Sequence, residues 1–179
     1  MKICIVRSDR MGDMILTLPV IQGIKQKNPQ AIIHVVASKK NLKICKKFSL
    51  IDKIYEKPNI SSIFNNLVKS INEEKYDYYF SFSPGWFGLF LGLFSNSKFK
   101  SNLILKSRYK SNVLSKFWQI VFSKIFFSVS VVVNRFKLLN EKKNIHQTKM
   151  MMNVVSKSGV AINKETQNEF TFKNLHALK

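Results

Sequence analysis

Short apolar runs alternate along this chain with longer segments in which apolar residues recur every three or four positions. Uninterrupted apolar runs of four to eight residues are typical of strands that are covered on both faces of a sheet. The segments between the runs have the period of helices with one buried face. The runs that predict strands are residues 2–7, 31–38, 52–57, 76–83 and 100–105.

The clearest helical period lies in residues 60–74, where six apolar residues share one face: Ile60, Ile63, Phe64, Leu67, Val68 and Ile71. In the segment 12–29, Pro19 blocks the backbone bond to residue 15, so we expect a bend or a fresh turn there. Strands that alternate with helices predict an α/β fold, a Rossmann-like parallel sheet with helices on both faces. The helices expected are 12–29, 39–48, 60–74, a helix after the turn at 84–85, and 111–127.

The segment 111–127 carries a wide apolar stripe opposite a polar face. The polar face holds Asn112, Lys116, Gln119 and Ser123. Such a stripe favours packing against the core. Large aromatic residues beside lysines also suit an interfacial helix on an anionic membrane, and this alternative stays open. The stripe is formed by Val113, Leu114, Phe117, Trp118, Val121, Ile125 and Phe126.

With 179 residues, the chain is long enough for one domain with a core, or for half of a larger protein. Cys4 and Cys45 lack the spacing of a metal site. They are interpreted as two small core residues of a reduced cytoplasmic protein without a disulfide. The longest uncharged apolar run, residues 125–134, is too short to span a bilayer, and we expect no signal peptide.

The formal net charge of +20, from 30 basic and 10 acidic residues, is the largest compositional feature. No Asp or Glu occurs from Tyr78 to Asn140, while basic residues are spread over 98–137. A region of one sign attracts polyanions or an anionic membrane surface, although a lysine-rich composition on solvated faces explains it equally well. Because the aromatic residues lie in apolar stripes and no nucleic-acid-binding motif is present, no nucleic acid partner is expected.

Candidate chemistry begins directly after the first strand, in the stretch "RSDRMGD" (residues 7–13). Ligands of open α/β sheets bind where strands lead into helices. Gly12 permits a tight turn and close ligand approach. Asp13 would open the helix, where free N–H groups keep a carboxylate ionised and able to accept a proton from a hydroxyl. The alternatives are that Asp13 only caps the helix and that Asp9 and Arg10 are turn residues.

Other well-known sites are missing from the sequence. Neither the glycine pattern of dinucleotide-binding domains nor that of a phosphate-binding loop is present. The histidines, His34, His146 and His176, are isolated from one another, so no metal site is expected. His34 lies in a predicted buried strand and is interpreted as structural.

The residues of the amino-terminal stretch resemble the glycosyltransferase family 9 heptosyltransferases. The resemblance rests on Asp9, Arg10, Gly12 and Asp13, on Thr17 with Pro19, and on Pro29 with Ala31. Weaker matches are "SLIDKIYEK", "YDYYFSFSP" and "IHQTKMMMNVVSKSGV", the last including His146 and Gly159. The resemblance extends over residues 1–162 and is strongest in the first 40.

This resemblance implies the GT-B architecture, in which two Rossmann-like domains face a cleft. Residues 1–162 would be the acceptor-binding domain, and 163–179 a linker or the start of a donor-binding domain absent from this chain. Asp13 would be the catalytic base, and Asp9, Arg10, Gly12 and Thr17 would contact substrate.

The resemblance also implies a reaction and its substrates. The enzyme would transfer a sugar, heptose from ADP-heptose, to the lipopolysaccharide core with inversion, without a metal or any cofactor other than this nucleotide-sugar donor. The phosphates and acidic sugars of that core would account for the basic stretch 98–137, with peripheral contact to the inner membrane. The alternative function is a non-catalytic basic module that binds an anionic membrane or glycolipid.

Overall fold

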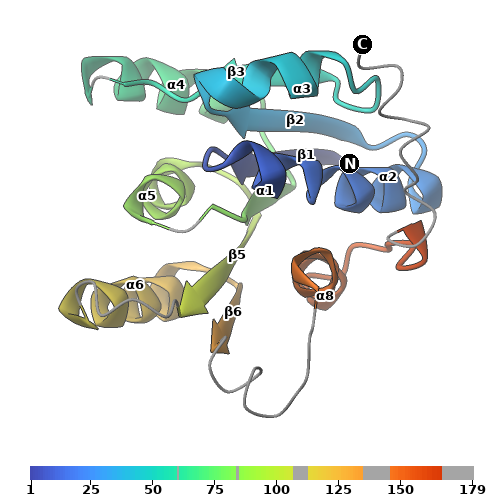
Figure 1. The fold of residues 1–179 in the computed structure, drawn as a ribbon. Coiled ribbons are helices and arrows are strands. Elements are labelled where there is room, and N and C mark those ends of the chain that lie inside the picture. Colours follow the sequence, from blue (N-terminus) through green and yellow to red (C-terminus); the bar gives the residue numbers. More distant parts are fainter. Residues whose placement is uncertain (60, 84, 107–112, 135–145, 167–179) are drawn as a thin grey trace.

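The computed structural model describes residues 1–59, 61–83, 85–106, 113–134 and 146–166 (Figure 1). Within these residues, the strands form one sheet in the order β3-β2-β1-β4-β5-β6, and each neighbouring pair is parallel. The strands are β1 (Lys2–Arg7), β2 (Ile32–Ala37), β3 (Lys53–Glu56), β4 (Tyr78–Ser81), β5 (Phe99–Lys106) and β6 (Val129–Asn134). This strand order is the doubly wound order of Rossmann-like domains, which confirms the predicted fold class.

Helices connect the strands and cover both faces of the sheet. The alternation of side chains along β1 shows this directly: Ile3 and Ile5 join a core with α2 and α8, whereas Cys4 and Val6 join a core with α4 and α5. The helical elements are α1 (Met11–Ile15), α2 (Leu18–Lys27), the 3-10 turn η1 (Lys39–Asn41), α3 (Leu42–Lys46), α4 (Ser61–Glu73), α5 (Trp86–Phe94), α6 (Val113–Phe126) and α8 (Gln147–Lys157).

The segment 12–29, predicted as one helix with a bend or fresh turn, forms two helices. α1 ends at Ile15 and α2 begins at Leu18, so that Pro19 lies in the first turn of α2. A proline is tolerated in a first turn because its missing N–H would have no partner there, whereas inside a helix its ring displaces the preceding turn. The expected fresh turn at Pro19 is therefore confirmed.

The interpretation of the 111–127 stripe as core is wrong for the described part of α6. Leu114 and Ile125 are each 66% exposed, whereas Gln119 and Ser123, on the face expected to meet solvent, are buried. α6 thus turns its polar face toward the sheet. β6, which follows α6, has no counterpart among the predicted strands, because its apolar run continues directly from the helical segment.

Two further interpretations from the sequence are confirmed: the cysteines are core residues and His34 is structural. Cys4 and Cys45 are both free and buried. Burial raises the pKa of each thiol, to about 11 for Cys45. His34 is buried and its Nδ1 lies 2.6 Å from the hydroxyl oxygen of Tyr76. Burial lowers the pKa of His34, as expected of a structural histidine.

The chain continues past residue 162 in contact with the domain. The backbone N–H of Asn163 donates to the carbonyl of Gly23 at 3.0 Å, and the hydroxyl of the fully buried Thr166 donates to the carbonyl of Pro19 at 3.2 Å. The boundary at 162 stays a prediction, and residues 167–179 of the predicted linker lie outside the described residues, as do Arg108, Lys110, Arg135 and Lys137 of the basic stretch.

Candidate active site

The carboxyl ends of β1 and β4 meet in the middle of the sheet. The strand order reverses between these two strands, and open α/β sheets bind ligands at such a switch point. Val6 pairs with Ser81, and the backbone N–H of Phe82 donates to the carbonyl of Val6 at 3.0 Å. This pairing brings the end of β1 beside the segment that leads from β4 toward α5.

Arg7, the last residue of β1, is the centre of the site and is fully buried. Its guanidinium donates to the carbonyl of Phe82 and, through Nε, to the carbonyl of Asp13 at 3.2 Å. It also forms ion pairs with two carboxylates, from Nε to Asp9 Oδ1 at 3.3 Å and from Nη2 to Asp13 Oδ1 at 3.1 Å. A buried guanidinium with this set of acceptors fixes the carboxylates in place.

Gln147, the first residue of α8, completes the inner side of the site. With its amide oriented to match its neighbours, its side-chain oxygen accepts from Arg7 Nη2 at 2.6 Å, and its nitrogen donates to Asp13 Oδ1 at 3.2 Å. One oxygen of Asp13 is therefore held by two side chains from different ends of the chain. The Asp13 side chain remains 24% exposed, so the carboxylate is both fixed and open to a ligand.

For Arg7 and Asp9, burial and the neighbouring opposite charges shift the pKa in opposite directions. Burial lowers the pKa of Arg7, while the charges of Asp9 and Asp13 oppose this shift. Burial raises the pKa of Asp9, the negative charge of Asp13 raises it further, and Arg7 opposes both. Two neighbouring carboxyl groups with different surroundings are a typical arrangement for proton transfer.

Arg10 and Gly12 lie on the exposed side of the same turn. The carbonyl of Arg10 accepts the first helical bonds of α1, from Asp13 N at 3.1 Å and Met14 N at 3.2 Å. Arg10 is thus the N-cap residue, and α1 has no side-chain cap, so the alternative in which Asp13 caps the helix is wrong. Asp13 lies inside the first turn and does not open the helix.

The tight turn expected at Gly12 is also absent. Gly12 is exposed within α1, and positive φ angles occur among the described glycines only at Gly85 and Gly159. A Cβ added to Gly12 would have no atom within 4 Å. The fold therefore does not require glycine at this position. A ligand that approaches the backbone of α1 would require it, because a side chain there would occupy the space of the ligand.

Thr17 does not reach the exposed side of the site. It is fully buried, and its hydroxyl donates to the carbonyl of Asp13 at 2.9 Å. This contact supports the backbone that carries Asp13. Contact between Thr17 and substrate stays a prediction, and the geometry favours a positioning role.

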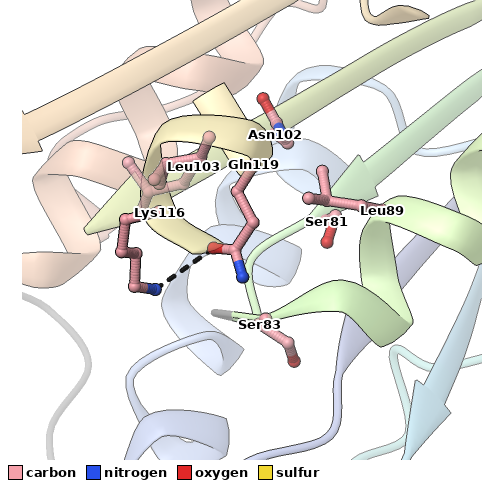
Figure 2. Close-up of a pocket in the computed structure, with 9 residues that line it drawn as sticks. Ser81, Ser83, Leu89, Asn102, Leu103, Lys116 and Gln119 are labelled. Atoms are coloured by element: carbon pink, nitrogen blue, oxygen red, sulfur yellow. Dashed lines mark hydrogen bonds between the residues drawn. The ribbon is translucent and has the colours of Figure 1, made fainter. Parts of the chain in front are cut away.

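A small pocket lies just past the end of β4, against the middle of β5 (Figure 2). Lys116 and Gln119 enter it from α6 and are joined by a hydrogen bond of 3.2 Å. Ser83 links the two parts of the site, because its hydroxyl accepts from the N–H of Ser8 at 2.6 Å and lies 3.5 Å from Asp9 Oδ1. The other lining residues are Ser81, Gly85, Leu89, Asn102, Leu103 and Ile104.

Within the described residues, no group of three or more His, Cys, Asp or Glu side chains is arranged to hold a metal ion. No helix there has the length and apolarity needed to cross a membrane.

Arg7 and Gln147 belong to the site but were not predicted from the sequence to do so. A charged residue at the end of the apolar run 2–7 was the available signal for Arg7, because a buried charge needs partners nearby. Gln147 lies within the matched stretch "IHQTKMMMNVVSKSGV", but that match did not assign it to the site, which it reaches through the packing of α8 against α2 and the sheet.

Comparison with known proteins shows the fold but not a family. No protein-family model matches the chain, and no curated protein matches it. A solved structure of glycosyl transferase family 9 from Veillonella parvula has a TM-score of 0.67 at 19% identity, and covers 89% of this chain and 42% of its own. E. coli heptosyltransferase WaaC with ADP has a TM-score of 0.65 at 14% identity, and covers 92% and 49%.

E. coli ADP-heptose lps heptosyltransferase II is similar over a shorter stretch, with a TM-score of 0.52 at 19% identity. It covers 57% of this chain and 30% of its own. The chain spans half or less of the length of these three proteins. The fold is therefore that of a Rossmann-like domain similar to part of a glycosyltransferase.

Proposed function

We propose that this chain is the acceptor-binding domain of a glycosyltransferase of the heptosyltransferase type, with Asp13 as the base. The observation that carries the proposal is the environment of Asp13. Its carboxylate is fixed by Arg7 and Gln147, yet stays partly exposed at the carboxyl edge of the sheet. The sequence pattern around Asp13 and the similarity of the fold to heptosyltransferase structures support the same proposal.

In the proposed reaction, the oxygen of an acceptor hydroxyl attacks the anomeric carbon of the donor sugar while its proton passes to Asp13. The bond between that carbon and the nucleoside diphosphate breaks, and the diphosphate leaves with the bonding electrons. Attack from the opposite face inverts the anomeric centre. Because a nucleoside diphosphate is a good leaving group, a carboxylate is a sufficient base, and the mechanism requires no metal.

The proposed acceptor is the lipopolysaccharide core, whose phosphates and acidic sugars complement the charge of this chain. Arg10 is the exposed cation nearest to the carboxylates in sequence and would contact an acidic group of the acceptor. The open backbone at Gly12 leaves room for a sugar ring beside Asp13. Asp9 would accept a hydrogen bond from a second acceptor hydroxyl.

The proposed donor is ADP-heptose. One of the similar structures is named as a heptosyltransferase with ADP, and that protein is about twice as long as the part this chain matches. We therefore assign most of the donor contacts to a second Rossmann-like domain, provided by the same or another polypeptide. This chain would act in the cytoplasm, where nucleotide sugars are made.

The test separates acceptor binding from catalysis. Calorimetric titration of the chain with deacylated lipopolysaccharide core oligosaccharide should show binding, which Arg10→Ala weakens about tenfold through loss of a charge-assisted hydrogen bond. Asp13→Asn should leave this binding within about twofold, because the amide keeps the shape of the carboxylate.

The catalytic arm joins the chain to the donor-binding domain of a heptosyltransferase and measures transfer from ADP-heptose. Asp13→Asn should lower the rate about 10²–10⁴-fold through loss of the base. The matched control is Glu56→Gln, which changes an exposed carboxylate at the end of β3 and should leave the rate unchanged. Transfer at the unsubstituted rate by Asp13→Asn would remove Asp13 from the mechanism.

A further inference from the structure

The helix α6 presents its apolar side chains to solvent. Five of its large apolar residues are between 43% and 66% exposed: Leu114, Phe117, Trp118, Ile125 and Phe126. At 100° per residue, the first four lie within a sector of about 100° on one face of the helix, and Phe126 lies about 80° beyond that sector. A continuous apolar stripe of this kind on a water-exposed helix marks a surface that another structure covers.

Polar contacts on the opposite face hold α6 in this orientation. The side-chain amide of Asn102, on β5, donates to the hydroxyl of Ser123 at 2.7 Å, and that hydroxyl donates to the carbonyl of Gln119 at 2.6 Å. The indole N–H of Trp86, in α5, donates to the hydroxyl of Ser115 at 3.0 Å. Turning α6 over to bury its stripe would break these bonds and leave Asn102 without a partner in the interior, which is costly.

The exposed apolar surface continues onto α5, which lies beside α6. Phe90 and Phe94 of α5 are 40% and 54% exposed. The rings of Trp86 and Phe122 meet edge to face at 5.8 Å, and Phe122 stacks on Phe126 at 5.8 Å, so an apolar groove runs between the two helices. We call the exposed residues the α5–α6 surface: Phe90, Phe94, Leu114, Phe117, Trp118, Ile125 and Phe126.

Charge decides which partner fits this surface. No Asp or Glu occurs between residues 78 and 140, so neither helix contributes a negative charge. Lys124 is exposed on α6 beside the stripe. A second copy of the chain would bring together two molecules of net charge +20, which repel each other. An anionic surface with an apolar interior complements both Lys124 and the exposed aromatic side chains.

We propose that the α5–α6 surface docks this protein on an anionic phospholipid bilayer, with α6 lying in the plane of the interface. Phe117, Trp118 and Ile125 enter the boundary between headgroups and acyl chains, while Lys124 meets lipid phosphates. This inference goes beyond the proposed sugar transfer and does not depend on it, because none of these residues belongs to the carboxylate site. For a lipid-linked acceptor, the same docking would hold the domain at the surface where its substrate lies.

The test is sedimentation of the 179-residue protein with vesicles of phosphatidylcholine that contain phosphatidylglycerol, compared with vesicles of phosphatidylcholine alone. We expect binding to the anionic vesicles that weakens as salt is added, with a blue shift of tryptophan emission as Trp118 leaves water. Ile125→Ser should reduce the partition coefficient about tenfold, and Phe117→Ser combined with Ile125→Ser about 100-fold. Because both side chains are exposed, neither change should disturb the fold.

The matched control is Ile32→Ser, the same substitution at another exposed isoleucine, 41% exposed at the start of β2 on the other half of the sheet. It should leave vesicle binding unchanged, as should Asp13→Asn, so that a failure of the sugar-transfer proposal remains distinguishable. Vesicle binding that Ile125→Ser does not alter, or equal binding to neutral vesicles, would overturn the proposal. Self-association that Ile125→Ser abolishes, without vesicle binding, would instead assign the surface to a second copy.

Discussion

The guanidinium of Arg7, at the end of the first strand, lies 2.6 Å from the side-chain oxygen of Gln147, at the start of α8. Asp13 Oδ1 lies within reach of both side chains, at 3.1 Å from Arg7 and 3.2 Å from Gln147. Parts of the chain that are distant in sequence therefore combine to aim one carboxylate at the edge of the sheet. Such support from neighbouring side chains is what keeps a reactive group in a productive geometry.

Arg7→Met should destabilise the fold strongly. Removing a buried cation leaves Asp9 and Asp13 close together without compensation, which costs about 3–5 kcal/mol of unfolding free energy at neutral pH. The loss should shrink in acid, where Asp9, whose pKa is raised by burial, becomes protonated. Urea unfolding at both pH values checks this. Arg10→Met, at an exposed position, should change stability by less than about 0.5 kcal/mol, and equal losses for the two variants would contradict the central role of Arg7.

Gln147→Leu should lower both stability and function. The leucine side chain has a similar size but offers no partner to Arg7 Nη2 or Asp13 Oδ1, which costs about 1–3 kcal/mol. Because Asp13 then loses one of the two side chains that fix its carboxylate, sugar transfer should fall while acceptor binding is retained. Gln30→Leu, at an exposed position in the turn before β2, is the matched control in urea unfolding. If Gln147→Leu left the rate of sugar transfer unchanged, Gln147 would have a structural role only.

Gly12→Ala should separate stability from ligand binding. Alanine is a better helix former, so the variant should be about 0.5–1 kcal/mol more stable in thermal unfolding, since its Cβ meets nothing within 4 Å. Acceptor binding should fall, because the methyl group occupies the space beside Asp13. Gly23→Ala provides the contrast: its Cβ would lie 2.5 Å from the carbonyl oxygen of Asn163, so this variant should be less stable.

Asp9 and Glu74 should affect stability with opposite dependence on pH. Burial raises the pKa of Asp9, so its contribution to stability is present below its ordinary pKa and is lost as pH rises through the raised value. Asp9→Asn should therefore be at least as stable as the parent at pH 7, and should lose that advantage in acid.

The pKa of Glu74 is shifted in the opposite direction to that of Asp9. Its hydrogen bonds with Lys2 and Lys53 lower its pKa to about 2, so its contribution is present above its ordinary pKa and is lost as pH falls toward 2. Glu74→Gln should be less stable than the parent at pH 7, and the difference should close in acid. Urea unfolding of Asp9→Asn, Glu74→Gln and the parent between pH 3 and 7 tests both predictions. If the unfolding free energies of the two variants changed with pH in the same way, the opposite pKa shifts of Asp9 and Glu74 would be refuted.

The sequence by itself determined the fold class and the place of the candidate site. Apolar runs that alternate with periodic segments are local patterns, and only a parallel sheet with two covered faces buries both kinds at once. The break between α1 and α2 was predictable from Pro19 for an equally local reason, because proline has no N–H to donate inside a helix. The stretch that holds Asp9, Arg10, Gly12 and Asp13 was found because strand ends lead into helices at ligand-binding edges.

Only the tertiary structure decided which groups meet and which faces are buried. The contact of Gln147 with Arg7 depends on where α8 packs, and the residues around Gln147 do not predict that contact. The amphipathic pattern of α6 predicts one apolar face. It does not predict whether that face contacts the core, a membrane or a second molecule. Asn102 settled the orientation of α6, because its hydrogen bond to Ser123 holds the polar face toward the sheet and leaves the aromatic side chains exposed.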